Sequence, residues 1–207
     1  MAQPSLRELA RPSITAVVLQ EIQNRVVGIE AARRELADAA ASVGVIPNAS
    51  RLAAAARAVG IPVIHATAET LPRGFGANHN ARLFAGARKF DAGHAPGTSP
   101  VFPVAEVHAD GDLILPRYHG LSPMTGTQLD TLLRNAGVTT VIIAGVSLNV
   151  AIPNTVFDAV NRSYQVVLPS DAVAGTPVEY GEQVLRYSLG FVATIATTDD
   201  LIATWKG

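Results

Sequence analysis

The chain has 207 residues, of which 48% are hydrophobic and 16% are charged, and its formal net charge is −1. This length suits a single α/β domain over residues 1–207, with a core that needs neither disulfides nor a structural metal. Sixteen basic against 17 acidic residues leave no positive surplus for phosphates, which argues against nucleic acid or an anionic membrane as partner. The absence of cysteine excludes disulfides, thiolate zinc sites and a thiol nucleophile.

The first 13 residues, MAQPSLRELARPS, are interpreted as an N-terminal extension (1–13). Charges and a proline stand there where a signal peptide would place its apolar stretch. No run of about 18 apolar residues occurs in the sequence, which argues against a transmembrane helix. We therefore expect a soluble, cytoplasmic protein.

Six short apolar runs, rich in β-branched residues and bounded by polar or turn residues, predict buried strands. They cover residues 14–19, 61–67, 112–116, 138–146, 164–170 and 190–197. Segments of helix length follow the later runs, at 126–137, 149–163, 177–190 and 197–207. Strands that alternate with helices indicate βαβ units. We expect a three-layer α/β/α fold, with a six-stranded, mainly parallel sheet and helices on both faces.

The alanine-rich stretch 30–60 connects the first two predicted strands and strongly favours helix. Gly44 and Pro47 interrupt it, so we interpret the stretch as two helices. The second helix is expected to begin near Asn48 or Ser50, which are good N-cap residues, and to end before Gly60.

Residues 68–111 break this alternation as a long loop insertion, rich in Gly, Pro, His and Asn and with little periodicity. A loop of this length in a compact domain is usually functional or disordered. It could form a lid or an oligomer contact, or equally a solvated loop anchored by a few aromatics. The residues concerned are Phe75, Phe84, Phe90, Arg73, Arg82, Arg88 and Lys89.

Two strand ends carry the residues of most interest, because ligands of open α/β sheets bind beyond the carboxyl ends of the strands. The first strand leads into LQEIQN, which places Glu21 and Gln23 at this edge, although this segment alone favours a solvated strand-to-loop carboxylate at Glu21. The fourth strand ends tightly at Gly145, and a helix is expected to start near Val150. Backbone N–H groups at such a helix start can bind an anion or oxyanion, although any βα junction offers them.

Together these stretches resemble the isochorismatase-like hydrolases, also called cysteine hydrolases, over nearly the whole chain. ITAVVLQEIQN resembles the first strand with its Asp-x-Gln-Asn signature, and IPNASRLAAAARAVGIPVIHA resembles the following helix and second strand. APGTSP resembles the Pro-Gly-Thr loop, and residues 112–175 resemble the block from the lysine segment to the Asp-Ala loop. The resemblance implies a six-stranded parallel sheet flanked by helices and assembly into dimers or tetramers.

The resemblance also implies a triad of aspartate, lysine and cysteine, in which the thiolate attacks an amide or ester carbonyl. In this chain every triad position departs from that pattern: Glu21 matches the aspartate, Arg117 best matches the lysine, and Ala151 matches the cysteine. The match to Arg117 needs a one-residue insertion, because the family spacing back from Gly126 reaches Tyr118. Ala151 closes the acyl-enzyme route, and an arginine stays protonated, so it can hold an anion but cannot act as a base.

One branch of the family, the isochorismatases of the phenazine and siderophore type, can lack the cysteine and cleave a vinyl ether by acid catalysis. Such chemistry needs a proton donor and water, without a covalent nucleophile. We therefore predict a small-molecule hydrolase without a cofactor, in which Glu21 is the general acid/base and Arg117 anchors an anionic substrate. The predicted substrate-binding residues are Gln23, Tyr118, His119, Val146, Ser147, Asn149 and Val150.

Two other functions stay open. A catalytically inactive family member would keep the pocket as a binding or oligomer-partner protein, and the loss of all three triad residues favours this. A phosphate or nucleotide binder is less favoured, because no glycine-rich phosphate loop follows the first strand. Ser147, beside an expected cis bond after Val146, is a weak replacement nucleophile because no base is visibly paired with it.

The five histidines are scattered along the chain, and IHATAE lacks the Asp-x-His pattern that metal-binding nicotinamidases carry after the second strand. We therefore predict no metal site. The histidines are His65, His79, His94, His108 and His119.

Overall fold

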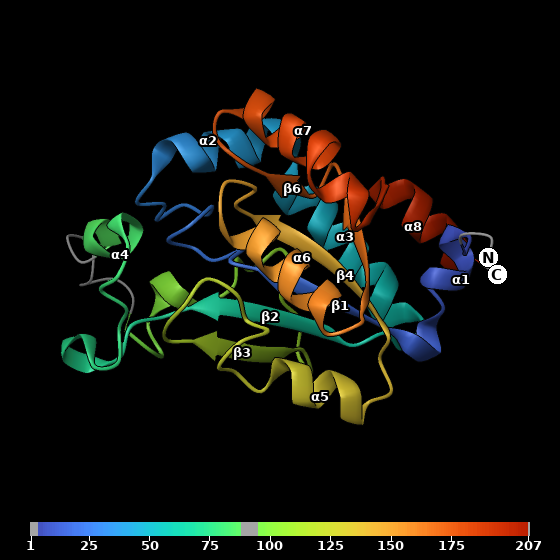
Figure 1. The fold of residues 1–207 in the computed structure, drawn as a ribbon, viewed down its shortest axis with the longest axis horizontal. Coiled ribbons are helices and arrows are strands. Elements are labelled where there is room, and N and C mark those ends of the chain that lie inside the picture. Colours follow the sequence, from blue (N-terminus) through green and yellow to red (C-terminus); the bar gives the residue numbers. More distant parts are fainter. Residues whose placement is uncertain (1–3, 88–94, 207) are drawn as a thin grey trace.

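The computed structural model describes residues 4–87 and 95–206. Its strands form one sheet in the order β3-β2-β1-β4-β5-β7, and the short β6 pairs with β4 (Figure 1). The pairings between these strands are all parallel. The predicted α/β class with a mainly parallel sheet is therefore confirmed. Arg88, Lys89, Phe90 and His94 of the predicted insertion lie outside the described residues.

The six predicted runs correspond to the six strands of the main path, and β6 is too short to leave a hydrophobic pattern. The strands are β1 (Thr15–Gln20), β2 (Val63–Ala68), β3 (Leu113–Arg117), β4 (Thr140–Val146), β5 (Gln165–Pro169), β6 (Val173–Ala174) and β7 (Thr194–Ala196). The last strand is shorter than predicted, because a 3-10 helix (Leu189–Phe191) precedes it and buries Leu189 completely.

Helices connect the strands or flank them at the chain ends. They are α1 (Leu6–Leu9), α2 (Arg34–Val43), α3 (Val45–Ala58), α4 (Arg82–Ala87), α5 (Leu129–Asn135), α6 (Ala151–Asn161), α7 (Val178–Tyr187) and α8 (Thr198–Trp205). The short α4 lies in the insertion, where no periodicity predicted it. None of the helices within the described ranges is long and apolar enough to cross a membrane.

The predicted start of the second alanine-rich helix near Asn48 or Ser50 was wrong, because α3 begins at Val45. Gly44 ends α2 and precedes α3 with φ +83°, a left-handed conformation that ends one helix and lets the next begin within one residue. Pro47 then lies in the first turn of α3, where a missing N–H costs no helical hydrogen bond. The proline that seemed to break the helix therefore belongs to its start.

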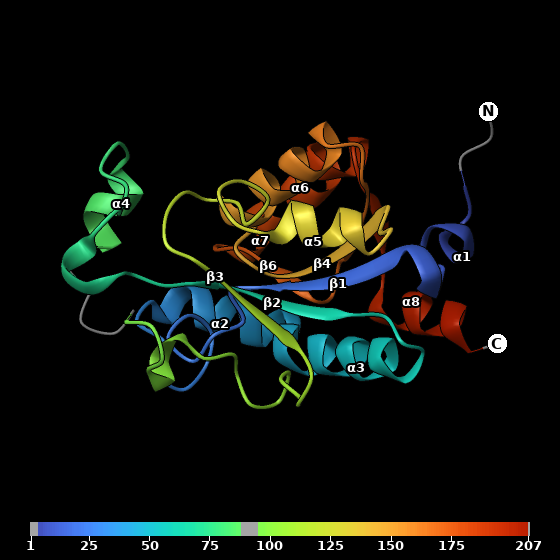
Figure 2. The same cartoon turned by 90° about the horizontal axis from the view of Figure 1, so that it is seen from below.

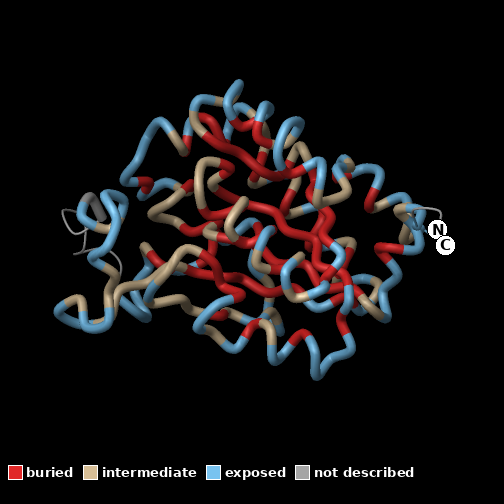
Figure 3. Tube along the Cα trace, in the orientation of Figure 1, coloured by how far each residue is buried: buried red, intermediate tan, exposed pale blue. Residues whose placement is uncertain are grey.

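Three layers are visible when the sheet is seen edge-on, with α2, α3 and α8 on one face and α5, α6 and α7 on the other (Figure 2). Alternate strand residues supply the two cores. Val17 and Leu19 pack toward Leu52 of α3, whereas Ala16 and Val18 pack toward Ile152 of α6. The inner strands β1, β2, β4 and β5 accordingly form the buried centre of the molecule, whereas the edge strands β3 and β7 are partly exposed (Figure 3). This arrangement confirms the prediction of helices on both faces.

The carboxyl ends of β2 and β3 point toward the end of the molecule where α4 stands apart from the three layers (Figure 1). The N- and C-terminal segments lie at the opposite end, where Trp205 Nε1 donates to the carbonyl of Ala10 at 2.7 Å. The strand ends that the sequence indicated as functional are thus gathered at one edge, together with the insertion.

Candidate active site

Glu21 follows β1 directly and lies between two neighbouring strands. Its N–H donates to the carbonyl of Ala66 at 3.0 Å, and the residue before it, Gln20, pairs in register with Ala66 and Gly145. Glu21 has φ +55°, in the left-handed region that costs a non-glycine residue about 1 kcal/mol. The chain therefore leaves the strand geometry at the carboxylate that the sequence predicted as catalytic.

Arg117 ends β3 and brings its guanidinium to Glu21. Arg117 Nη2 donates to Glu21 Oε1 at 2.6 Å, and Nη1 donates to the carbonyl oxygen of Gly120. The side chains are only 10% and 17% exposed, so solvent screens this ion pair much less than a surface pair. The predicted acid/base residue and the predicted substrate anchor are thus each other's partners.

The start of α6 lies beyond the neighbouring strand β4. Gly145 approaches β1 so closely, with φ +123°, that a Cβ atom there would overlap the carbonyl oxygen of Gln20. The peptide bond from Val146 to Ser147 is cis, as the family resemblance implied. Helix α6 then begins at Ala151, which is 8% exposed and carries only a methyl group where the resemblance places the nucleophile.

Backbone donors remain at this helix start. The N–H groups of Val150 and Ile152 both donate to the carbonyl of Ser147, at 3.2 and 3.0 Å. The N–H of Ala151 makes no hydrogen bond to the described part of the chain. Because the N-terminus of a helix carries a partial positive charge, this N–H is suited to bind an oxyanion.

A buried hydroxyl connects Ala151 to β1. Thr155 Oγ1 lies 2.7 Å from Gln20 Oε1 and 2.9 Å from the carbonyl oxygen of Ala151, and both side chains are at most 1% exposed. Gln20 Nε2 has no hydrogen-bond partner among the described residues. The residue that precedes Glu21 is thereby joined to the first turn of α6.

The side-chain amides of two predicted substrate-binding residues, Gln23 and Asn149, form hydrogen bonds within the protein. Gln23 is 1% exposed and donates from Nε2 to the carbonyls of Ala68 and Val101, while its Oε1 accepts from the N–H of Ala68. Asn149 exchanges two hydrogen bonds with the backbone of Thr176, at 2.7 and 2.9 Å. Gln23 therefore joins the end of β1 to β2 and the insertion, and Asn149 holds the loop that follows β6.

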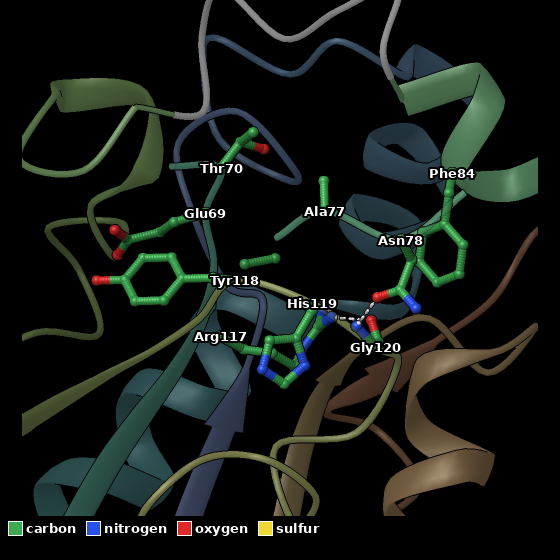
Figure 4. Close-up of a pocket in the computed structure, with 10 residues that line it drawn as sticks. Glu69, Thr70, Ala77, Asn78, Phe84, Arg117, Tyr118, His119 and Gly120 are labelled. Atoms are coloured by element: carbon green, nitrogen blue, oxygen red, sulfur yellow. Dashed lines mark hydrogen bonds between the residues drawn. The ribbon is translucent and has the colours of Figure 1, made fainter. Parts of the chain in front are cut away.

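A small cavity of about 100 Å³ opens beside Arg117, between the ends of β2 and β3 and the segment before α4. In Figure 4 the Glu69 and Tyr118 side chains extend in the same direction, away from Asn78 and Phe84. The sequence predicted Tyr118 and His119 here, and Phe84 only as a loop aromatic. The cavity is lined by Ala68, Glu69, Thr70, Ala77, Asn78, Phe84, Arg117, Tyr118, His119 and Gly120.

Glu69 and Asn78 were missed by the sequence analysis. Burial raises the pKa of the Glu69 carboxyl, and the hydrogen bond from Thr67 Oγ1, at 2.9 Å, lowers it by less. Glu69 directly follows β2, so the rule that directed attention to Glu21 also applied to it. Asn78 carried no signal, because its surroundings in the sequence show no periodicity.

A second polar cluster lies at the amino end of β3, away from this edge. Arg57 donates to both carboxylate oxygens of Asp112, His65 Nε2 lies 2.8 Å from Oδ2, and the N–H of Ala109 donates to the same oxygen. Burial raises the pKa of Asp112, but these hydrogen bonds and the charge of Arg57 outweigh it and lower the pKa to about 2.

Burial lowers the pKa of His65 by more than Asp112 raises it, and the ring Nδ1 has no partner within the described chain. No group of three or more potential metal ligands occurs among the residues that the structure describes. The contacts of Asp112 with His65 and Arg57 connect the start of β3 to β2 and α3.

Comparison with known proteins gives a consistent result. The model of the isochorismatase domain family matches residues 15–200. A ureidoacrylate amidohydrolase of Rhizobium rhizogenes is 28% identical over 216 residues, which cover 94% of this chain and 84% of that protein.

Two solved structures share the fold. A cysteine hydrolase from Pseudomonas syringae pv. phaseolicola superposes with a TM-score of 0.81 at 25% identity, over 100% of this chain and 99% of the other. An isochorismatase family protein from Desulfovibrio vulgaris gives a TM-score of 0.77 at 26% identity, over 91% and 98%. Because the family model matches residues 15–200, nearly the whole chain, this protein belongs to the isochorismatase family of hydrolases.

Proposed function

We propose that this protein hydrolyses a small carbonyl compound by acid/base catalysis, without a covalent intermediate. The observation that carries the proposal is the Glu21–Arg117 ion pair, which keeps an acid and a cation together at the strand edge. Two neutral residues at these positions would have left no group to move a proton. The uncommitted N–H of Ala151 and the cavity beside Arg117 add an oxyanion donor and room for a ligand.

The proposed reaction begins with a proton transfer to Glu21. Glu21 is the carboxylate that lies at this strand edge beside Arg117, so we assign it the role of general base in the first step. It takes a proton from water as the water oxygen attacks the carbonyl carbon, and the oxyanion that forms is stabilised by the Ala151 N–H. Glu21 then returns the proton to the leaving group as the bond to that group breaks.

Arg117 retains donors for a substrate. A guanidinium has five N–H groups, and the contacts with Glu21 and Gly120 use one on each terminal nitrogen. The remaining donors can bind a substrate carboxylate in the cavity that Arg117 lines. The relative named a ureidoacrylate amidohydrolase favours amides or ureido compounds that carry a carboxylate as substrates. Arg117, rather than Tyr118, is accordingly proposed to occupy the lysine position.

A catalytically inactive binding protein is the second candidate, and the same ion pair gives it support. Glu21 and Arg117 satisfy each other's charge, and Ala151 offers no nucleophile. The two charges of this ion pair neutralise each other, so no charged substrate is needed to balance them. In that case the cavity would bind a ligand without converting it.

A substrate panel distinguishes the two candidates. The purified protein is incubated with amides, ureido compounds, imides, lactones and vinyl ethers, each with and without a carboxylate, and products are measured by mass spectrometry. We expect turnover of a carboxylate-bearing member, and a loss of about 100-fold or more in kcat/KM in Glu21→Gln. Glu35→Gln, the same change at an exposed position in α2, serves as the matched control and should retain full activity.

Two results would contradict the proposal. One is the absence of turnover for every class of compound, and the other is turnover that Glu21→Gln leaves unchanged. Saturable binding of a panel member without conversion, followed by isothermal titration calorimetry, would identify the protein as the inactive binder.

A further inference from the structure

A chain of hydrogen bonds connects the segment before α4 to the carboxylate of Glu21. Asn78 Oδ1 accepts from the N–H of Gly120 at 2.6 Å. The carbonyl oxygen of Gly120 accepts from Arg117 Nη1, and Arg117 Nη2 donates to Glu21 Oε1 at 2.6 Å. Gly120 is therefore held on one side by a residue of the insertion and on the other by the proposed catalytic pair.

Gly120 has little else to fix its position. It lies in the irregular loop between β3 and α5, and its φ of +72° is a conformation that glycine adopts without strain. A glycine in a loop has more accessible conformations than any other residue, so its hydrogen bonds decide where its carbonyl lies. The only side chain that accepts from its N–H within the described residues is Asn78.

The position of that carbonyl matters for Arg117. An arginine side chain is long and has several rotatable bonds, so its guanidinium lies where its acceptors hold it. Among the described residues, the acceptors of the Arg117 guanidinium are the Glu21 carboxylate and the Gly120 carbonyl. If the carbonyl moves, the guanidinium can rotate, and the carboxylate loses its fixed partner.

We propose that Asn78 is a positioning residue, which fixes Arg117 and through it the Glu21 carboxylate by holding Gly120. Asn78 itself does not touch the reacting atoms. Asn78, Gly120 and Arg117 line the same cavity, so a ligand bound there contacts the residues that orient the pair. The inference rests on the function proposed above for the role of Glu21, whereas the link from Asn78 to Arg117 can be tested separately.

The first experiment measures this link without any substrate. Hydrogen exchange of the Gly120 amide and of the Arg117 guanidinium N–H groups is followed by NMR in the wild-type protein and in three variants. Asn78→Ala should speed both exchange rates by about fivefold, the effect of losing one hydrogen bond of about 1 kcal/mol. Asn78→Asp keeps an acceptor oxygen and should restore slow exchange.

Asn80→Ala is the matched control. It removes the other contact of the same amide, the 3.3 Å hydrogen bond from Asn78 Nδ2 to Asn80 Oδ1, and leaves the contact to Gly120 in place. Both exchange rates should equal those of the wild type. The variant therefore separates the Gly120 contact from a general loosening of the segment.

The second experiment uses a substrate from the panel. Asn78→Ala should lower kcat/KM by about fivefold or more, because a displaced acid/base group slows the chemical step and a less fixed Arg117 holds the substrate carboxylate less firmly. Exchange rates that do not change in Asn78→Ala overturn the inference, whatever the activity. Faster exchange in a protein that converts no substrate supports the positioning role and contradicts the proposed function instead.

If Asn78→Ala does not fold, the exchange rate of the Gly120 amide in the wild-type protein still tests the inference. A Gly120 amide that exchanges as fast as an unstructured peptide would overturn the proposal, and a protected one supports it.

Discussion

Arg117 Nη2 lies 2.6 Å from Glu21 Oε1, across a sequence separation of 96 residues. The two charged groups that the resemblance matches to the family's lysine and aspartate therefore form a pair. Because both side chains are largely shielded from water, we expect this pair to influence stability as well as the proposed proton transfer.

Removal of either charge should destabilise the fold. Glu21→Gln leaves the Arg117 cation shielded without its carboxylate, and we expect the free energy of unfolding to fall by about 1–3 kcal/mol. Arg117→Gln should cost a similar amount. The double variant should cost about 1–2 kcal/mol less than the sum of the single changes, because it leaves no unpaired charge. Urea denaturation of the wild type, the two single variants and the double variant measures this coupling. If the changes in the free energy of unfolding simply add, the ion pair does not contribute to stability.

Restoring the triad should restore covalent chemistry. In the variant Glu21→Asp, Arg117→Lys, Ala151→Cys, the new thiol stands at the first residue of α6. The helix N-terminus should lower its pKa and make it reactive. We expect rapid alkylation by iodoacetamide at pH 7 and an acyl adduct of the substrate on intact-mass spectra.

The matched control for this gain is Ala32→Cys, which places a thiol at an exposed position before α2. Its alkylation should follow the rate of an ordinary thiol, and no acyl adduct should form. Equal reactivity of the two thiols would contradict an activating environment at Ala151.

Stability should fall in acid because of Asp112. Its pKa is lowered from 3.8 to about 2 in the folded protein, so the ionised carboxylate stabilises the fold. This contribution, about 2 kcal/mol, is fully present above pH 3.8 and is lost as the pH falls toward 2. Protonation of His65, whose pKa burial lowers, acts in the same direction at low pH.

Urea denaturation between pH 2 and 7 tests this contribution. Asp112→Asn should be less stable than the wild type at neutral pH, and the difference should shrink toward pH 2. The neighbouring exposed Asp110→Asn should follow the wild-type curve. A difference for Asp112→Asn that does not depend on pH would rule out the ionised carboxylate as its source.

The buried amide of Gln20 offers a fourth test. Its Nε2 has no partner among the described residues, and an unpaired buried donor costs about 1–3 kcal/mol. Gln20→Met, which keeps the length of the side chain, should therefore leave the free energy of unfolding unchanged or raise it by about 1 kcal/mol. Thr155→Val, in contrast, leaves Gln20 Oε1 without its partner and should destabilise the protein by about 1–2 kcal/mol. Thermal denaturation compares them, and a Gln20→Met variant less stable than Thr155→Val would contradict the expectation.

The strands and helices that form the three layers of this protein could be predicted from local sequence patterns. The strands are short apolar runs, and a run buried on both faces is recognisable without knowledge of its neighbours. The start of α6 near Val150 followed from the strand end before it. The start of α3 did not, because a proline in the first turn of a helix and a proline that ends one look alike in sequence.

The absence of a cysteine nucleophile is also settled by sequence alone, since the chain contains no cysteine at any position. What the remaining residues do was decided by the tertiary structure. The sequence placed Glu21 and Arg117 at the same edge, but their contact depends on side-chain directions and on the left-handed backbone of Glu21. The contact from Asn78 to Gly120 and the occupied amide of Gln23 likewise join distant segments, and no local periodicity encodes hydrogen bonds of that range.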